Sequence, residues 1–268
     1  MHIPPFALVL TAAGSSLRFS SSFAEGESVK KEFLKIDGHS VLYRAALPFY
    51  RTPGLAAVAV TYREGCEDET IIALEDLADI SAIPLVFVRG GATRQESVHL
   101  ALEKLAALPV SFDYAAIHDG ARPYITQELI LSTLAVAATE DAALPGLAVT
   151  DSIRRIDRNG HIVEIVDRRG LVRVQTPQIF PFTRILDAHR LAGADNGASD
   201  DAELYIKAGG QCTIVPGDEK NIKITFEQDI PDAREQILTY IEERREGRKE
   251  REHSQMFRRF LNGMEDRQ

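Results

Sequence analysis

The chain has 268 residues, of which 44% are hydrophobic, and its formal net charge is −9 with a sequence pI near 5.3. This length allows one large domain or two small ones, and the acidic balance disfavours a general nucleic-acid binder, which usually presents a basic face. No apolar run reaches the roughly 18 residues of a membrane span, and no basic segment marks a signal peptide. Cys66 and Cys212 have neither metal-ligand spacing nor a disulfide framework, so we expect a cytoplasmic protein with free thiols.

Strand-like and helix-like segments alternate along the chain. This order favours an α/β fold with a Rossmann-like, mostly parallel sheet covered by helices on both faces. Ligands of such sheets bind beyond the carboxyl ends of the strands, so the loops after the strands are the candidate functional segments. The predicted strands are Ala7–Leu10, Ala56–Thr61, Leu85–Arg89, Tyr114–Ile117, Gly146–Thr150 and Cys212–Val215. The predicted helices are Val41–Tyr50, Thr70–Ala78, Arg94–Leu105, Gln127–Ala138 and Thr183–Ala192.

The first predicted strand ends in a turn of small residues, Thr11-Ala12-Ala13-Gly14-Ser15-Ser16. Small residues let backbone N–H groups approach a bound anion closely, and Arg18 and Lys31 could add the positive charge that a nucleoside triphosphate needs. The turn lacks the G-x-x-x-x-G-K-[ST] and G-x-G-x-x-G patterns, so it is neither a P-loop nor a dinucleotide fingerprint. Such a turn can also serve only to pack a helix on a sheet, and it does not decide the function alone.

Two later loops carry residues suited to binding a nucleotide. Gly90 and Gly91 allow a tight turn, after which Arg94 and Ser97 share one face near the start of a helix, where N–H groups can bind an anion or a base edge. Asp119 follows a buried strand and is the leading candidate ligand for Mg²⁺, which prefers one or two carboxylates together with phosphates and waters. Structural alternatives stay open for both loops: a glycine-rich turn with a surface arginine, and an aspartate that caps a turn.

The segment from Ser152 to Arg168 interrupts the alternation. It contains two short strands joined by Arg158-Asn159-Gly160, and Asn-Gly is a strong hairpin signal. Its outer face is charged, so residues 151–172 could project as a dimerisation arm, with an ordinary edge hairpin as the alternative. The tail over residues 242–268 is dense in mixed charge and is interpreted as a solvated C-terminal extension.

The sequence shows no Ser-His-Asp, Cys-His or H-E-x-x-H arrangement, so the expected chemistry needs no activated protein nucleophile. Nucleotidyl transfer meets this condition, because a phosphate monoester is already anionic at neutral pH and can attack an α-phosphorus without a general base. The protein must then bring two anions together and stabilise charge through Mg²⁺, Lys and Arg. Residues suited to holding a second, phosphorylated substrate are Thr150, Asp151, Ser152, Asp167, Arg168 and Thr176. Lys223 could also reach a phosphate, with protection of a sheet edge as the alternative.

The chain resembles the 2-C-methyl-D-erythritol 4-phosphate cytidylyltransferase family of the non-mevalonate isoprenoid pathway. The resemblance extends from about Phe6 to Ile230, and its specificity comes from the combination and order of the motifs. It implies transfer of CMP from CTP to the sugar-alcohol phosphate, with release of pyrophosphate, by a nucleotidyltransferase domain over residues 1–241 that uses Mg²⁺. The motifs are LTAAGSSLRF, KKEFLKIDG, GGATRQESV, HDGARP, TDSIRR, VDRRGL, TPQIF, SDDAELY and NIKIT.

The resemblance also implies roles for individual residues. The catalytic cations fall on Arg18, Lys31 and Lys223, and the metal-binding aspartate falls on Asp119. The family's hairpin arm crosses to a partner subunit, which implies a homodimer whose arms complete the neighbouring sites. The nucleotide-binding residues are Ala12, Ala13, Gly14, Ser15, Gly91, Ala92, Ser97 and Arg122, and the substrate-binding residues are Asp151, Ser152, Arg168 and Thr176.

The first loop departs from the family's pattern. Ser16 stands where the family usually has a second glycine, and Lys30-Lys31-Glu32 stands where it usually has Pro-Lys-Gln. Arg18 and Lys31 lie farther apart than in the family, so Ser20–Val29 is an insertion, interpreted as a flexible loop that could cover the phosphate site.

Other functions remain open at the level of sequence. A cytidylyltransferase for another polyol phosphate, such as ribitol 5-phosphate, would share the fold, the loop and the aspartate. A nicotinamide-dependent oxidoreductase is disfavoured because G-x-G-x-x-G is missing. A non-catalytic nucleotide sensor is disfavoured by the presence of Arg18, Lys31 and Asp119.

Overall fold

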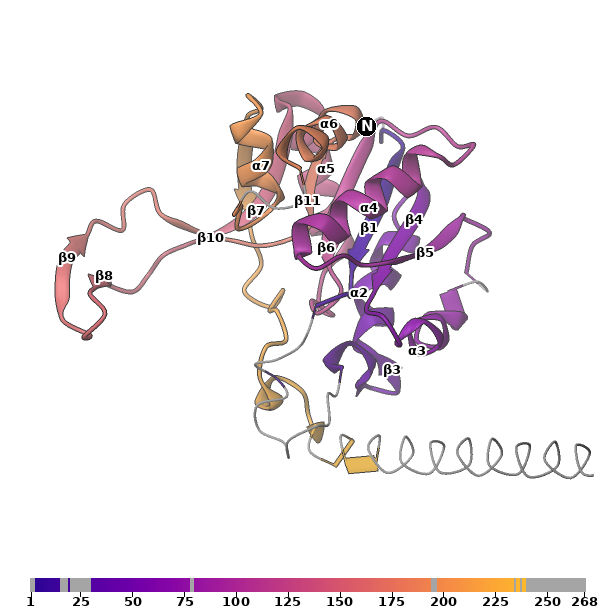
Figure 1. Ribbon diagram of the computed structural model, residues 1–268, viewed down its shortest axis with the longest axis horizontal. Helices are drawn as coiled ribbons and strands as arrows, with labels where there is room; N and C mark the ends of the chain where they lie inside the picture. The colour runs from indigo at the N-terminus through magenta and orange to yellow at the C-terminus, as the bar shows by residue number, and fades with distance from the viewer. Residues whose placement is uncertain are drawn as a thin grey trace, which may run out of the picture.

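The computed structural model describes residues 3–14, 19, 30–77, 80–193, 197–233, 235–236 and 238–239. Its centre is an eight-stranded sheet in the order β10-β7-β11-β6-β1-β4-β5, with β12 paired to β7 (Figure 1). Strands β10 and β11 run antiparallel to the other six, so the sheet is mostly parallel, as predicted. The strands are β1 (Phe6–Thr11), β4 (Leu55–Tyr62), β5 (Leu85–Arg89), β6 (Tyr114–Asp119), β7 (Ala142–Ala148), β10 (Val172–Val174), β11 (Gln178–Pro181) and β12 (Cys212–Pro216).

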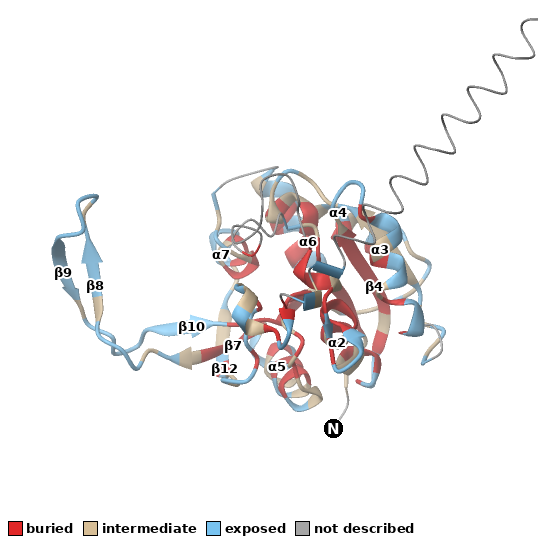
Figure 2. Cartoon of the chain, turned by 90° about the horizontal axis from the view of Figure 1, so that it is seen from below, coloured by how far each residue is buried: buried red, intermediate tan, exposed pale blue. Residues whose placement is uncertain are grey.

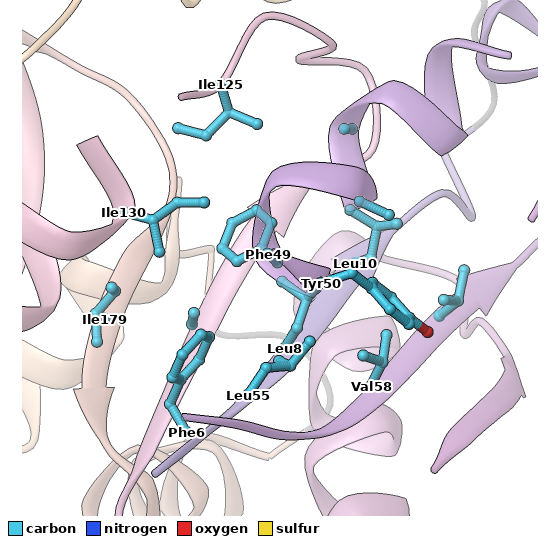
Figure 3. Close-up of a cluster of buried hydrophobic side chains, with 14 of the residues drawn as sticks. Phe6, Leu8, Leu10, Phe49, Tyr50, Leu55, Val58, Ile125, Ile130 and Ile179 are labelled. Atoms are coloured by element: carbon cyan, nitrogen blue, oxygen red, sulfur yellow. The ribbon is translucent and has the colours of Figure 1, made fainter. Parts of the chain in front are cut away.

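Helices cover both faces of the sheet because successive side chains of a strand point to opposite sides. In β1, Phe6, Leu8 and Leu10 pack with α2 and α5 (Figure 3), whereas Ala7 and Val9 pack with α4, α6 and α7. This three-layer arrangement confirms the predicted α/β class. The helices are α2 (Val41–Tyr50), α3 (Glu67–Ile72), α4 (Arg94–Ala106), α5 (Gln127–Glu140), α6 (Phe182–Ala192) and α7 (Asp201–Lys207), with 3-10 turns η1 (Lys31–Phe33), η2 (Glu75–Leu77) and η3 (Glu227–Asp229).

Two hairpins of the described chain lie outside the main sheet. The first pairs β2 (Lys35–Ile36) with β3 (His39–Ser40) just before α2, and the second pairs β8 (Ile153–Ile156) with β9 (Ile162–Val166). The β8–β9 hairpin, called the arm below, extends away from the body of the molecule (Figure 1), and most of its residues are exposed (Figure 2). Gly160 in its turn has φ 86°, a conformation that suits the Asn-Gly signal found in the sequence.

Several predicted boundaries are wrong. The strand predicted at Gly146–Thr150 is β7, which begins at Ala142, because Asp141, with φ 119°, turns the chain into the sheet directly after α5. The helix predicted at Thr70–Ala78 begins at Glu67 and ends at Ile72, and a separate 3-10 turn follows. Strands β10 and β11 and the hairpin β2–β3 escaped prediction because runs of two to four residues are too short to show a period.

Some predictions concern residues whose structure is not described. They are those for Ser15, Arg18, the insertion over Ser20–Val29 and the extension over residues 242–268. Within the described part of the chain, no helix is both long enough and apolar enough to cross a membrane.

Candidate active site

The carboxyl ends of three neighbouring strands meet at one edge of the sheet. Thr11 at the end of β1 lies in register with Thr61 of β4 on one side and with Asp119 of β6 on the other. A cavity of about 620 Å³ opens at this edge, where the sequence predicts a ligand site. The structure brings together there the predicted site residues Ala13, Gly14, Lys31, Gly91, Ala92, Ser97, Asp119 and Lys223.

Hydrogen bonds with Thr61 and Lys30 fix the backbone of the small-residue turn after β1. The N–H of Ala12 donates to the Thr61 carbonyl (3.2 Å) and hydroxyl (3.1 Å) oxygens, and Nζ of Lys30 donates to the carbonyl oxygens of Ala12 (3.0 Å) and Gly14. Lys30 is 1% exposed, and burial lowers its pKa. The N–H of Ala12 is therefore used in anchoring the turn to β4, while Ala13 and Gly14 line the cavity.

The loop before α4 is ordered by the first turn of that helix. The N–H of Gly91 donates to Oγ of Ser97 (3.1 Å), and the N–H of Ala92 donates to Oε2 of Glu96 (2.7 Å). Thr93 is the N-cap of α4, and its side chain accepts from the N–H of Glu96 at 3.1 Å. The residues predicted to read the base thus form one hydrogen-bonded unit at a helix N-terminus.

Gly90 allows this unit to approach the first turn. A Cβ atom at Gly90 would lie 2.3 Å from Cβ of Ala13 and 2.8 Å from Oγ of Ser97, so no side chain fits there. The two predicted nucleotide-binding segments therefore touch across the edge of the sheet.

Asp119 is surrounded by three cationic side chains although its own side chain is only 8% exposed. Its Oδ2 lies 2.8 Å from Nζ of Lys223 and 3.6 Å from Nε of Arg122, and its Oδ1 lies 3.6 Å from Nε of Arg94. Burial by itself would raise the pKa of Asp119, but the three cations outweigh burial and hold that pKa far below its usual range. The carboxylate is therefore ionised at neutral pH.

The two oxygens of Asp119 are engaged unequally. Oδ2 has the close Lys223 contact, whereas the described polar neighbours of Oδ1 are Oγ1 of Thr11 at 3.4 Å and Arg94 at 3.6 Å. No group of three or more His, Cys, Asp or Glu side chains that could hold a metal occurs among the described residues. One open carboxylate oxygen fits a Mg²⁺ ion that takes its other ligands from phosphates and water, and does not fit an all-protein cage.

Thr176 lies beneath the cavity and does not line it. Its hydroxyl oxygen accepts from the N–H of Asp119 at 3.1 Å and lies 2.9 Å from Nδ1 of His118, while Nε2 of His118 lies 3.3 Å from the carbonyl oxygen of Arg122. Since a carbonyl can only accept, we assign the proton to Nε2, so that Nδ1 accepts from Thr176. Burial lowers the pKa of His118 to about 4, so the ring is neutral at physiological pH and anchors Asp119 through Thr176.

The remaining predicted residues lie away from the cavity lining. Arg122 is mostly buried behind Asp119 and donates to the carbonyl oxygen of Asn221 at 2.7 Å. Asp151, Ser152 and Arg168 are exposed at the base of the arm, and none of them lines the cavity of this chain.

Further charged residues line the cavity. Arg94, which the sequence places with Ser97 at the start of a helix, comes from the first turn of α4, and Glu32 lies in the KKEFLKIDG motif. Arg63 also lines the cavity, and the sequence assigned no role to it. The cationic lining residues Lys31, Arg63, Arg94 and Lys223 outnumber the acidic ones, Glu32 and Asp119, in the described part of the cavity. Such a surface favours an anionic ligand despite the acidic protein.

Comparisons with known proteins identify the family of this chain. The family model for 2-C-methyl-D-erythritol 4-phosphate cytidylyltransferase matches residues 6–239. The chain is similar to a bifunctional IspD/IspF enzyme of Paracoccus denitrificans (strain Pd 1222), with 39% identity over 244 residues that cover 89% of this chain and 57% of that protein. The chain thus spans little more than half the length of the curated relatives that it matches.

Two solved structures are similar over most of their length. One is 2-C-methyl-D-erythritol 4-phosphate cytidylyltransferase from Thermus thermophilus, with 28% identity, a TM-score of 0.66 and coverage of 87% of this chain and 99% of that one. The other is 4-diphosphocytidyl-2C-methyl-D-erythritol synthase from Anaerococcus prevotii, with 25% identity, a TM-score of 0.68 and coverage of 86% and 94%.

Proposed function

This chain belongs to the 2-C-methyl-D-erythritol 4-phosphate cytidylyltransferase family, and on that premise we propose that it transfers CMP from CTP to 2-C-methyl-D-erythritol 4-phosphate. The products would be 4-diphosphocytidyl-2-C-methyl-D-erythritol and pyrophosphate. The observation that carries this proposal is the cavity that unites the first turn, the start of α4, Asp119, Lys31 and Lys223.

In this proposal the nucleotide lies across the edge of the sheet. Its triphosphate contacts the turn at Ala13 and Gly14, where small residues permit close approach to backbone N–H groups. Its base lies against Gly91, Ala92 and Ser97, at the N-terminus of α4. Ser15 and Arg18 stay predictions for the same triphosphate, since they lie outside the described residues.

The proposed reaction joins two anions. A phosphate oxygen of the acceptor forms a bond to the α-phosphorus of CTP while the bond from that phosphorus to the β-phosphate oxygen breaks, and pyrophosphate leaves with that electron pair. The acceptor phosphate is largely a dianion at neutral pH, so no base need remove a proton. Lys31 and Lys223 hold the anions and offset the added charge, and Mg²⁺ bound at Asp119 would neutralise further charge on the triphosphate.

The arm motivates the proposal of a homodimer. Asp151, Ser152 and Arg168 lie at its exposed base, remote from the cavity lining of the same chain. The arm also presents exposed apolar side chains, among them Ile162 at 63% and Ile165 at 75% exposure, which a second copy could cover. In this dimer each arm supplies its acceptor-binding residues to the neighbouring cavity.

The direct test measures pyrophosphate release by the purified chain with CTP, Mg²⁺ and either 2-C-methyl-D-erythritol 4-phosphate or ribitol 5-phosphate. The proposal expects turnover with CTP and the erythritol phosphate, little with the ribitol phosphate, and none in EDTA. Preference for ribitol 5-phosphate would replace the proposed acceptor. CTP binding without pyrophosphate release from any acceptor would indicate a nucleotide sensor instead of an enzyme.

A further inference from the structure

A buried carboxylate outside the cavity lining binds one of the cavity's cationic side chains. Asp201, in the first turn of α7, has a side chain only 1% exposed, and its Oδ2 accepts a 2.7 Å hydrogen bond from Nη1 of Arg94. Its Oδ1 lies 3.2 Å from Nε2 of His189 in α6, whose side chain is fully buried. Burying a carboxylate is costly unless it is paired, so this one is held in a defined place by both of its oxygens.

Arg94 is shared unequally between two carboxylates. Its Nη1 lies 2.7 Å from Asp201, whereas its Nε lies 3.6 Å from Oδ1 of Asp119. Burial would lower the pKa of Arg94, but the two carboxylates outweigh burial and raise that pKa, so the guanidinium stays charged. The guanidinium thus lies nearer to the carboxylate of α7 than to that of Asp119.

We propose that Asp201 is a positioning residue of the active site, which holds Arg94 off Asp119 so that Oδ1 of Asp119 is available to the divalent cation. This inference rests on the proposed function, because that function requires a cation at Asp119. The guanidinium already lies within 3.6 Å of Oδ1. Once released from Asp201, it moves closer to Oδ1 and competes with the metal for that oxygen, while Oδ2 keeps its contact with Lys223. His189 assists by fixing the second oxygen of Asp201.

The test compares Asp201→Asn with Asp200→Asn in the full chain. Asparagine keeps the size of each side chain and removes its charge. Asp200 caps α7 by accepting from the N–H of Glu203 and also accepts from the amide of Gln178, both at 2.9 Å, and asparagine caps helices about as well. Asp200→Asn therefore removes the same charge next to Asp201, keeps the helix cap, loses the hydrogen bond from Gln178, and leaves the ion pair between Arg94 and Asp201 in place.

The readout is the factor by which Mg²⁺ tightens CTP binding, obtained by calorimetry with saturating Mg²⁺ and again in EDTA. We expect Asp201→Asn to lower this factor about tenfold without weakening CTP binding in EDTA, and Asp200→Asn to change it by less than about twofold. The Mg²⁺ concentration for half-maximal pyrophosphate release should rise in the same proportion. A purely structural role would weaken CTP binding in both media alike, and that result would overturn the proposal.

A double variant tests directly whether Arg94 competes with the metal. Adding Arg94→Gln to Asp201→Asn removes the competing guanidinium, so the factor by which Mg²⁺ tightens CTP binding should return toward that of Arg94→Gln alone. A factor that does not recover would contradict competition between Arg94 and the metal. If Asp201→Asn does not fold, His189→Gln is the alternative, because it removes a contact of Asp201 and keeps the charges of Asp201 and Arg94. It should lower the factor by which Mg²⁺ tightens CTP binding about threefold. An unchanged factor would overturn the proposal. A wild-type chain without Mg²⁺-dependent cytidylyl transfer would instead refute the proposed function.

Discussion

Charged side chains serve different ends in two regions of this molecule. At the edge of the sheet, Asp119 is only 8% exposed and lies within 3.6 Å of three cations. In the arm, Arg155 and Glu164 pair at 2.6 Å, but their side chains are 67% and 50% exposed. The arm pair is the shorter contact, yet water and salt screen it, whereas burial makes the Asp119 cluster strongly coupled. Distance alone therefore does not identify a functional ion pair.

The consequence is that the two regions should respond differently to the same kind of substitution. Removing a partner in the buried cluster leaves a charge without compensation in a poorly solvated place, which is costly. Removing a partner in the arm returns the other side chain to water. Substitutions in the buried cluster should therefore have much larger effects than substitutions in the arm.

Asp119→Ala should abolish Mg²⁺-dependent activity, lowering kcat/KM by about a thousandfold or more, because it removes the carboxylate proposed to hold the metal. Pyrophosphate release across a range of Mg²⁺ concentrations measures the effect. Asp157→Ala in the turn of the arm removes the same charge and should keep wild-type turnover. Full activity of Asp119→Ala would mean that the metal is held elsewhere.

Lys31→Ala should lower turnover by about a hundredfold while weakening CTP binding only a few-fold, because a cation beside the transferring phosphoryl group acts mainly on charge that develops in the transition state. Single-turnover kinetics and CTP calorimetry separate the two quantities. Lys35→Ala, at an exposed position of β2, is the matched control. Equal losses in turnover and in binding would remove the proposed role of Lys31.

His118 should make stability depend on pH. Its pKa is about 4 in the folded protein, against an ordinary 6.5, so between these values the unfolded chain binds more protons than the folded one. The free energy of unfolding should therefore be highest above pH 6.5 and fall as the pH drops toward 4, by at most about 3 kcal/mol. Urea unfolding at several pH values measures this slope.

His118→Gln should flatten the slope over this pH range, even though losing the ring also lowers stability at every pH. A wild-type slope in His118→Gln would assign the pH dependence to other groups.

Arg155→Ala in the arm should have the smallest effect. Its partner Glu164 is half exposed, so water replaces the lost contact and the urea midpoint should not shift measurably. Arg122→Ala provides the contrast, because its side chain is 12% exposed beside Asp119 and its loss should lower the midpoint clearly. Equal shifts in the two variants would contradict the role that we assign to burial.

Much of the fold and part of the site could be predicted because their signals are local. The apolar runs at Ala7–Leu10 and Tyr114–Ile117 are continuous enough to identify strands, and parallel order implies that their carboxyl ends meet. The glycines and small residues that follow such strands mark the segments where a ligand can approach the backbone. For this reason most of the predicted nucleotide-binding residues lie in one cavity.

Contacts between distant segments could not be predicted, because no sequence pattern carries their geometry. The sequence suggests that Thr176 binds the substrate. In the structure, its hydroxyl group instead hydrogen-bonds the backbone N–H of Asp119 and the ring of His118. Arg94 and Asp201 are 107 residues apart, and their ion pair exists because α4 and α7 pack on the same face of the sheet.

The residue types and their order were thus sufficient for the fold class and the family, since their signals come from neighbours along the chain. Burial, charge coupling and the division of Arg94 between two carboxylates arose when the sheet and its helices closed around Asp119 and excluded water. These properties depend on distances in space, which the linear chain does not contain.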